Sequence, residues 1–383
     1  LILTEHSFSV LKMVVQNSDV ESNPLEKLAE IQIKHTRAIL ITGLLLTLML
    51  STGLPSIQLE TDFQSSLPND LEPIKAQDKV ESEFRSSSSI IILFQVNDKP
   101  QEESFVTDVR DPEMIQMLKN LQSQLEDESM VGQVRSPASL FPKVPESKEQ
   151  VKATVDRAGG GVFFNRDYTA TQMYVSLNEE MSEENIREAT QLINQNIKQT
   201  PKQPGIDITV TGTPVIRTDL GDVMVSDSLT TISAASMLIL VLLSFARGKV
   251  YGPITFVPLF IGLIWTLGTM GLLGIPLTIA TIALGAMILG LGVEYGSFIT
   301  ERIIEEKKEF GVEKAVQESV PTTGLAILGS STTTVVGFSA LLIASISFIR
   351  NLGLTLALGI TLTLISALVI TPALIIEFER WQK

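Results

Sequence analysis

Apolar residues along this chain gather into six long runs, each separated from the next by polar residues or a short turn. A helix needs roughly 20 apolar residues to cross a bilayer, and each run is near or above that length. The pattern therefore predicts an α-helical polytopic membrane protein, with one helix, a long insert and then five more helices. The six predicted transmembrane helices are residues 38–57, 229–246, 250–273, 275–299, 321–343 and 352–378.

Four segments lie outside these runs. Residues 1–37 form a polar leader, and the run that follows is expected to be an anchor because it is too long and too far from the start for a signal peptide. Residues 58–228 form a large insert. Residues 301–319 are charged and carry apolar positions at helical spacing, which predicts an amphipathic linker helix. Residues 379–383 form a short tail.

The insert alternates between strand and helix patterns. Two rounds of strand, helix and strand follow one another, and Ser182 is the expected N-cap of the second helix. This order predicts an external α+β domain made of two ferredoxin-like subdomains. The predicted elements are residues 89–96, 111–128, 131–134, 170–177, 182–199 and 206–211.

Basic residues near the ends of the apolar runs indicate the orientation of the chain, because such residues concentrate on the cytoplasmic side. With six spans, the basic residues close to the spans fall on one side, and Arg350 is the exception. Both termini are therefore predicted to be cytoplasmic in a multi-pass protein of the cell membrane, and the insert extracytoplasmic. The basic residues on the cytoplasmic side are Lys34, Arg37, Arg247, Lys249, Arg302, Lys307, Lys308, Arg380 and Lys383.

The charge and composition exclude several classes of function. The net charge is −14, and the insert alone carries 29 acidic and 16 basic residues, so binding to nucleic acid is not expected. The chain has no cysteine, and its two histidines, His6 and His35, precede the first span. A histidine-containing catalytic triad and a histidine or thiolate metal site are thus not expected in the rest of the chain. We predict neither an enzyme nor a protein with a cofactor.

One carboxylate lies inside a predicted span. Glu294 belongs to the fourth apolar run, and a charged side chain at the centre of a membrane helix costs roughly 2.5–3.5 kcal/mol on insertion scales. Desolvation disfavours the charged form of such a group, and a carboxyl group that exchanges a proton is what a proton-driven transporter needs. Glu294 is therefore predicted to belong to a proton relay. The neighbouring Tyr295 points about 100° away on a helix and belongs to a different part of that relay or to packing.

Glycines accompany Glu294 on the fourth run. Gly292 and Gly296 are four residues apart, a spacing that lets a neighbouring helix approach closely, and Gly290 lies one turn before Glu294. These three glycines and Gly337 of the fifth run are predicted to serve helix packing. We expect the fifth helix to be the neighbour.

The fifth run carries a polar stripe. Ser330, Thr333, Thr334 and Gly337 fall at positions i, i+3, i+4 and i+7, so they share one helix face. The three hydroxyl groups are candidates for hydrogen bonding the Glu294 carboxyl group or leading water to it. Two alternatives remain: the hydroxyl groups serve only packing and backbone bonding, and Glu294 reaches the cytoplasmic headgroups from the end of its span.

These residues together resemble a known family. The fourth run reads GLGVEY at residues 290–295 and continues to acidic and basic residues, and the fifth reads SSTTTVVGF at 330–338. With TPAL at 371–374 and TGTPV at 211–215, the chain resembles one repeat of the resistance-nodulation-division (RND) superfamily of exporters. Within that superfamily it is most similar to the MMPL branch and its hopanoid-exporter relatives.

The resemblance implies an exporter of hydrophobic or lipid-like molecules that is driven by the proton-motive force, with the insert as its external porter-like α+β domain. Glutamate stands at Glu294 where the family usually has aspartate, which keeps an acid but lengthens its reach. Full-size members carry two such repeats and this sequence carries one, so a homodimer is expected to restore the paired arrangement. A trimer is the lesser possibility.

Two other functions remain open on the sequence. Accessory subunits of the protein-secretion translocon share the layout of one helix, an insert and five helices, and they also use an acidic residue in the fourth helix. A sterol-sensing-like lipid receptor or scaffold would bind lipid in the same bundle without pumping. The chain contains no GxxxxGK[ST] motif, so ATP is not indicated as the energy source.

Overall fold

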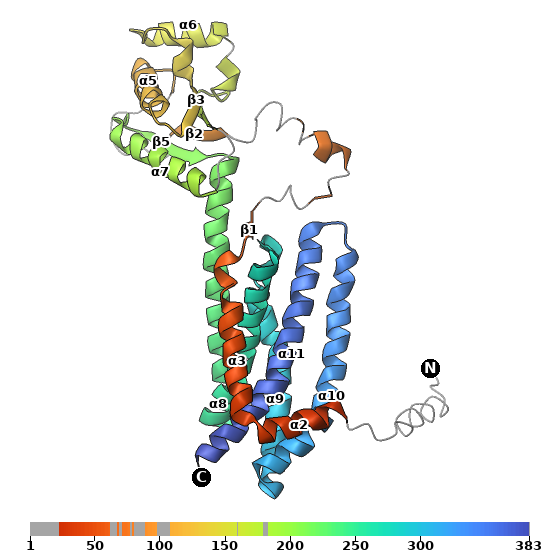
Figure 1. Cartoon of the computed structure of the whole chain (residues 1–383). Helices are drawn as coiled ribbons and strands as arrows, with labels where there is room; N and C mark the ends of the chain where they lie inside the picture. Colours follow the sequence, from red (N-terminus) through yellow and green to blue (C-terminus); the bar gives the residue numbers. More distant parts are fainter. Residues whose placement is uncertain are drawn as a thin grey trace. The chain divides into compact units, whose positions relative to one another are not determined.

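The computed structural model describes residues 23–61, 67–68, 71–76, 79, 89–97, 108–158, 160–178 and 183–382 (Figure 1). The chain divides into two compact units. The helical unit comprises Leu1–Glu60 and Met224–Lys383, and the α/β unit comprises Thr61–Val223. Two predictions, on residues 1–22 of the polar leader and on Ser182 as an N-cap, lie outside the described residues.

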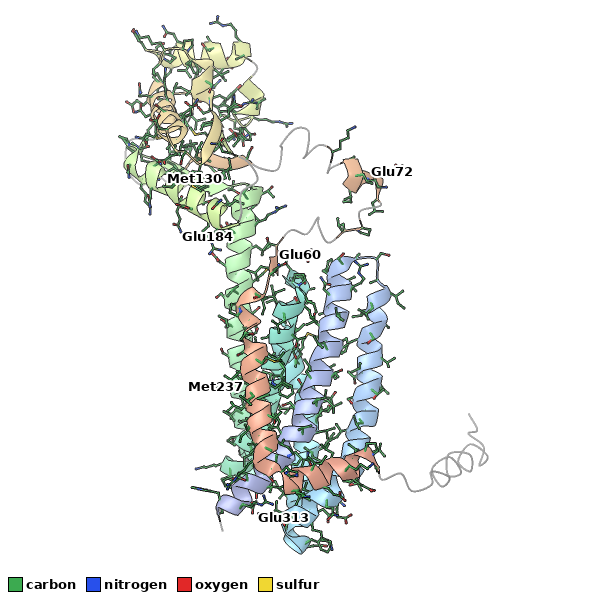
Figure 2. All side chains as sticks on the ribbon, viewed as in Figure 1. Glu60, Glu72, Met130, Glu184, Met237 and Glu313 are labelled. Carbon is green, nitrogen blue, oxygen red and sulfur yellow. The ribbon has the colours of Figure 1, made fainter. Side chains whose placement is uncertain are left out.

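The helical unit is built from long apolar helices. Five helical segments of the described chain are long and apolar enough to cross a membrane. Their outer faces are apolar as well, as at Met237, labelled in Figure 2, which is 70% exposed. An apolar exterior of this kind is typical of helices that contact lipid. The helices that supply this unit are α2 (Pro24–Lys34), α3 (Thr36–Ser51), α8 (Thr213–Leu273), α9 (Leu284–Phe310), α10 (Val312–Ser339) and α11 (Ser347–Trp381).

Helix α8 is too long for one span. Its 61 residues would extend about 90 Å as a straight helix, three times the thickness of a bilayer core. The backbone is not helical at Gly248, where φ is 84° and ψ is 166°, so α8 consists of two arms that meet at this residue. The arms pack closely, since a Cβ atom on Gly252 would lie 2.5 Å from the Ser244 Cα atom. The break falls at the basic turn that separates two of the six predicted spans.

Two predicted boundaries need correction. Residues 275–299 do not form one helix, because α9 begins at Leu284 and is preceded by strand β6 (Leu277–Thr278) and the 3₁₀ turn η4 (Ile279–Thr281). Pro276 has no N–H to donate, and β6 pairs in parallel with β1 (Leu59–Glu60) instead.

The predicted linker helix at residues 301–319 is also absent as a separate element. Its first half is the end of α9 and its second half is the start of α10. Gly311 separates the two helices with a φ of 79°, a conformation that glycine adopts without steric cost.

Helix α2 was predicted only as part of a polar leader, and it is an ordered helix on the helical unit. Asn23 caps it by accepting a hydrogen bond from the Leu25 N–H, and Pro24 occupies its first turn. One face, with Leu25, Ala29 and Gln32, is buried as α2 packs on α10 and α11. Its polar face explains why hydropathy alone did not reveal it.

In the part of the α/β unit that the structure describes, the strands form one sheet rather than the two predicted subdomains. Its strands are β2 (Ser89–Val96), β3 (Val131–Arg135), β4 (Ala170–Leu177) and β5 (Ile206–Thr211). The order is β3-β4-β2-β5, and every neighbouring pair is antiparallel. Each strand–helix–strand round therefore receives a strand of the other round between its own two, which is the split βαβ pattern of a single ferredoxin-like fold.

The core of this unit lies on one face of the sheet. Side chains of β4 alternate between buried and half-buried positions, and the buried ones pack with the helices. Asp111 starts the first of these helices as an N-cap, accepting from the Glu113 N–H at 2.9 Å. The helices are α5 (Pro112–Glu126), α6 (Lys148–Ala158) and α7 (Glu183–Gln199).

Candidate functional site

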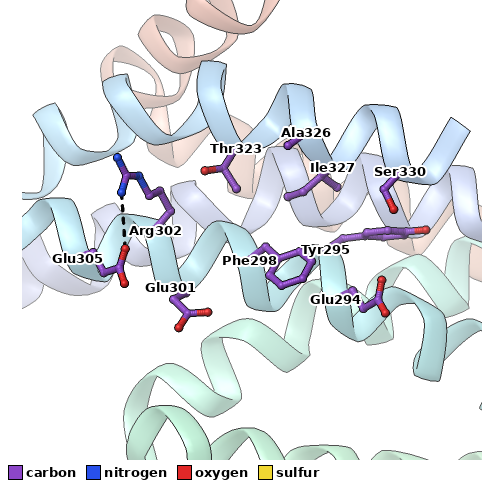
Figure 3. A pocket seen from close by; sticks show the side chains of 10 residues that line it. All are labelled: Glu294, Tyr295, Phe298, Glu301, Arg302, Glu305, Thr323, Ala326, Ile327 and Ser330. Atoms are coloured by element: carbon purple, nitrogen blue, oxygen red, sulfur yellow. Dashed lines mark ion pairs between the residues drawn. The ribbon is translucent and has the colours of Figure 1, made fainter. Parts of the chain in front are cut away.

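The candidate site is a groove between α9 and α10 (Figure 3). Glu294 lies in the first half of α9, and its side chain is exposed on the outside of the single chain. The next residue, Tyr295, is only 4% exposed. Consecutive helical residues point about 100° apart, so one helix presents a carboxylate outward and sends an aromatic side chain into the bundle.

The groove encloses a cavity of about 320 Å³. Glu294 and Tyr295 of α9 and Ser330 of α10 line one end of it in Figure 3, and charged residues of α9 line the other. The walls between the two ends are mostly apolar. The lining residues are Glu294, Tyr295, Phe298, Glu301, Arg302, Glu305, Thr323, Ala326, Ile327 and Ser330.

The charges at the two ends differ in their partners. Arg302 pairs with Glu305 at 3.6 Å and with Glu306 at 2.5 Å, and Glu301 accepts from Arg247 of α8 at 2.9 Å. Among the residues that the structure describes, Glu294 forms no ion pair. The groove therefore has one end with compensated charges and one end with a single uncompensated carboxylate.

Comparison with known proteins identifies the chain. The sequence model of the MMPL family matches residues 65–383, which is most of the chain. The chain belongs to the MMPL family. It is also 31% identical, over 340 residues, to a membrane protein of Methanocaldococcus jannaschii, and the match covers 86% of this chain and 87% of the relative. MMPL proteins are membrane transporters of the RND type, so the resemblance found in the sequence is confirmed.

The groove of this MMPL protein brings together three of the five residues predicted for a relay. Glu294, Tyr295 and Ser330 line it, whereas Thr333 and Thr334 do not. The hydroxyl groups of both threonines donate to the Ser330 carbonyl oxygen, at 2.7 and 3.3 Å. These hydroxyl groups are thus engaged with their own helix, as the packing alternative expected, and a relay role for any of the five residues stays a prediction.

The four predicted packing glycines fall into two groups. A Cβ atom on Gly292 would lie 2.5 Å from the Thr363 Cγ2 atom, and one on Gly296 would lie 3.1 Å from the Thr255 Cγ2 atom. These two glycines pack on α11 and α8, so the expectation that the fifth helix is their neighbour is wrong. Gly290 and Gly337 have open space where a Cβ atom would be, so packing within this chain does not require a glycine at either position. Among the described residues, no atom beyond the backbone of the same helical turns lies within 4 Å of a Cβ atom built on either glycine.

Sequence reasoning missed the rest of the groove wall. Thr323, Ala326, Ile327 and Ser330 fall at i, i+3, i+4 and i+7 on α10, so they continue the polar stripe toward the start of the helix. Phe298 follows Glu294 by one turn on α9. This spacing could be read from the sequence, but the predicted stripe ran from Ser330 toward Gly337, whereas the groove runs from Ser330 toward Thr323.

A second polar cluster was also missed. The Glu379 carboxylate of α11 accepts from the Tyr251 hydroxyl of α8 at 2.5 Å and lies 2.5 Å from the Lys307 Nζ of α9. Lys307 also donates to the Tyr251 hydroxyl at 3.1 Å, and Glu379 is only 8% exposed. Three helices are therefore joined by one partly buried ionic cluster, whose members are separated by more than 50 residues along the chain.

The carboxylates of the groove are spread along α9. Glu294, Glu301 and Glu305 succeed one another along the helix and do not converge on a point. Within the described ranges, no three acidic or histidine side chains come close enough to hold a metal ion. The site is thus a row of charges along one helix with a hydroxyl-bearing wall opposite.

Proposed function

We propose that this MMPL protein exports hydrophobic or lipid-like molecules by coupling their movement to the proton-motive force, with Glu294 as the group that takes up and releases the proton. The observation that carries the proposal is the uncompensated Glu294 carboxylate in the groove of an apolar, membrane-length helix. Tyr295 and Ser330 stand beside it with hydroxyl groups that can hydrogen bond either form of a carboxyl group.

Desolvation gives the Glu294 carboxyl group a reason to take up a proton. An ionised carboxylate at the centre of a membrane helix costs roughly 2.5–3.5 kcal/mol, and protonation removes the charge. One elementary charge that crosses the membrane releases roughly 2.3 kcal/mol per 100 mV. A carboxyl group that is alternately exposed to the two sides therefore connects the membrane potential to a rearrangement of α9 and α10.

The proposal includes a topology. The two arms of α8 on either side of Gly248 each cross the membrane, which makes six spans from five long helical segments. Basic residues then lie on the cytoplasmic side with both termini, and the α/β unit lies outside the cytoplasmic membrane. No enzymatic step and no cofactor form part of this proposal.

A homodimer completes the proposal. Glu294 and Ser330 are exposed on the outer face of the single chain, where lipid would otherwise meet the carboxylate. A second copy related by a two-fold axis would cover both grooves and bring two Glu294 residues to one interface. This matches the arrangement of two repeats about an axis along the membrane normal that is found in transporters.

Proton flux into liposomes tests the proposal. The purified protein is reconstituted with a pH-sensitive dye inside, a proton gradient is imposed, and candidate lipids are added. We expect flux that rises with lipid in the wild type and falls at least tenfold in Glu294→Gln, which keeps the size of the side chain and removes its proton chemistry. Glu309→Gln is the matched control, because it makes the same change on an exposed part of α9 outside the groove.

The outcomes separate the functions left open by the sequence. Equal traces for the wild type and Glu294→Gln would remove the relay and favour a lipid receptor or scaffold. Co-purification with a translocon channel, together with proton flux that rises with polypeptide and not with lipid, would favour an accessory role in protein secretion. Flux that depends on sodium in place of protons would keep the transporter and change the coupling ion.

A further inference from the structure

The α/β unit contains a second cavity, which begins at a distortion of strand β3. Val131 and Val134 of β3 pair with Leu177 and Val175 of β4, so β3 has one more residue than β4 between the two pairs. This is a β-bulge, and bulges re-aim the side chains beside them. Ser176 stabilises it by accepting from the Gln133 N–H at 2.9 Å and donating to the Gln133 carbonyl at 2.8 Å.

Arg135, which follows the bulge, is an exposed cation that is bonded to Gln133 within the bulge. The guanidinium of Arg135 donates from Nε and from Nη2 to the Gln133 side-chain oxygen, at 3.1 and 2.9 Å. These bonds use two of its five N–H donors. Among the residues that the structure describes, Arg135 forms no ion pair, so its remaining donors have no acidic partner.

Aromatic and apolar side chains stand next to this cation. Tyr174 of β4 is the cross-strand partner of Arg135, so the two side chains leave the sheet on the same face. The Phe163 ring lies 6.4 Å from the Tyr174 ring, centroid to centroid. Gln172 fixes this wall by donating to the Val162 carbonyl at 2.8 Å and to the Tyr174 hydroxyl at 2.6 Å.

These groups line a cavity of about 590 Å³, a volume typical of sites that hold small molecules. Among the residues that the structure describes, Arg135 is the one charged residue that lines it, in a unit that is otherwise strongly acidic. The surrounding acidic charges are screened over about 8 Å at physiological ionic strength. Among the described lining residues, the adjacent guanidinium is therefore the charge that acts directly on an anion in the cavity.

We propose that this cavity binds the head of a single-chain anionic amphiphile, with a carboxylate or phosphate on Arg135 and Tyr174 and the chain along Phe163 and Val162. Guanidinium groups bind both oxyanions through paired hydrogen bonds, and the aromatic and aliphatic wall suits an alkyl chain. The site gives a ligand class to the export function proposed above and rests on that function for its role. Binding of the amphiphile to this cavity is measured independently of transport.

Photochemical labelling of the full chain tests the site. Two probes carry a diazirine near the head of an alkyl chain, one with a carboxylate and one with a phosphate monoester, and a methyl ester of the first is the uncharged counterpart. The protein is illuminated in nanodiscs, digested and mapped by mass spectrometry. We expect an acidic probe to label peptides that contain Phe163 and Tyr174, and the methyl ester to label them at least tenfold less.

The variants isolate the guanidinium. Arg135→Gln is expected to reduce this labelling about tenfold or more, because charge-assisted bonds to the head are lost. Arg135→Lys keeps the charge without the planar guanidinium, so its labelling should lie between that of the wild type and that of Arg135→Gln. Arg157→Gln is the control, since it makes the same change at an exposed arginine of the same unit outside the cavity. Thermal unfolding of each variant shows whether it is folded.

Several results would overturn the site. They are equal labelling by the methyl ester, undiminished labelling of folded Arg135→Gln, or labelling confined to the membrane helices. Labelling by one acidic probe alone would identify the head as carboxylate or phosphate. If labelling follows Arg135 while proton flux is unaffected by Glu294→Gln, the site stands and the proposed coupling fails. If proton flux depends on Glu294 while labelling does not depend on Arg135, the proposed coupling stands and the site is wrong.

Discussion

Gln32 is a buried side chain that compensates for a proline in another helix. Pro372 of α11 has no N–H, so the carbonyl of Leu368, four residues earlier, lacks its helical donor. The Gln32 side-chain nitrogen donates to this carbonyl at 2.7 Å and to the Val369 carbonyl at 3.3 Å. A residue from the polar leader thus satisfies a backbone group inside an apolar bundle, where unpaired carbonyls are costly.

Replacement of Gln32 by leucine is expected to destabilise the protein by about 1–3 kcal/mol, because it leaves the Leu368 carbonyl buried and unpaired. Thermal unfolding in mild detergent measures the effect. The same change is also made in a Pro372→Ala variant, which restores the missing N–H of α11. In that variant, Gln32→Leu should reduce the stability of the protein by less. Equal costs in both backgrounds would contradict the compensation.

Asp108 of the α/β unit is a partly buried carboxylate with basic neighbours. Burial disfavours its ionised form, but hydrogen bonds from the side chain and N–H of Arg110 and an ion pair with Lys152 outweigh this and lower the pKa of the Asp108 carboxyl group. A lowered pKa in the folded protein means that the carboxylate stabilises the fold above its ordinary pKa. That stabilisation is lost as the pH falls through the lowered value.

Hydrogen–deuterium exchange followed by mass spectrometry is expected to reveal this loss. After correction for the intrinsic rate at each pH, protection of α6, whose Lys152 contacts Asp108, should fall in the wild type as the pH is lowered below 3.8, the ordinary pKa of the carboxyl group. Asp108→Asn should show a smaller change over the same range. Asp167→Asn, at an exposed residue, is the control and should behave like the wild type.

At the scale of elements, α9 presents different faces to its neighbours. Gly292 and Gly296 allow α8 and α11 to approach closely, whereas a Cβ atom on Gly290, half a turn from Gly292, would meet no described atom of another helix within 4 Å. Glycine content alone predicted packing for all three. Only the rotation of α9 within the bundle distinguishes the tight positions from the open one.

This difference gives a paired prediction. Gly292→Ala should destabilise the protein by about 1–3 kcal/mol, because the new methyl group meets Thr363 at 2.5 Å. Gly290→Ala should be neutral or stabilising by up to about 1 kcal/mol, since alanine is the better helix former. Thermal unfolding of the two variants side by side measures both, and a larger cost at Gly290 would contradict the packing described.

The order of the strands in the sheet cannot be derived from the sequence pattern of each strand. Strand β4 alternates along its length, and that period of two predicted a strand with one buried face. It did not indicate that β4 lies between β2 and β3, because pairing depends on contacts between residues about 80 and 40 positions apart. Two local strand–helix–strand rounds thus suggested two subdomains, whereas interleaving of their strands makes one.

At the scale of the whole molecule, the groove on the outer face of α9 and α10 is where a second copy is expected. Because the chain has no cysteine, single cysteines can be introduced for cross-linking without removing others. Ala326→Cys, exposed and lining the groove, should cross-link two chains in membranes with a short thiol-reactive reagent. Leu48→Cys on α3, also exposed, is the control and should remain monomeric. Equal cross-linking at both positions, or none at Ala326→Cys, would contradict this interface.

The candidate site was partly predictable from the sequence. Glu294 could be recognised as a candidate because it is an acidic residue within an apolar run, and a charge in a membrane helix is costly however that helix packs. The polar stripe that includes Ser330 correctly indicated that α10 forms the groove wall opposite α9. Which hydroxyl groups reach the groove depended on helix rotation, and Thr333 and Thr334 turned out to bond within their own helix.

The sequence by itself determined the apolar helices, the acidic insert with its strands and helices, and the family. Those properties depend on local composition and spacing, which set hydrophobic burial and backbone preference along a short stretch. Only the tertiary structure decided the single interleaved sheet, the outward position of Glu294, the Gln32 bond to α11 and the cluster of Tyr251, Lys307 and Glu379. Each of these depends on contacts between distant residues, and no local pattern encodes the rotation and register with which the elements meet.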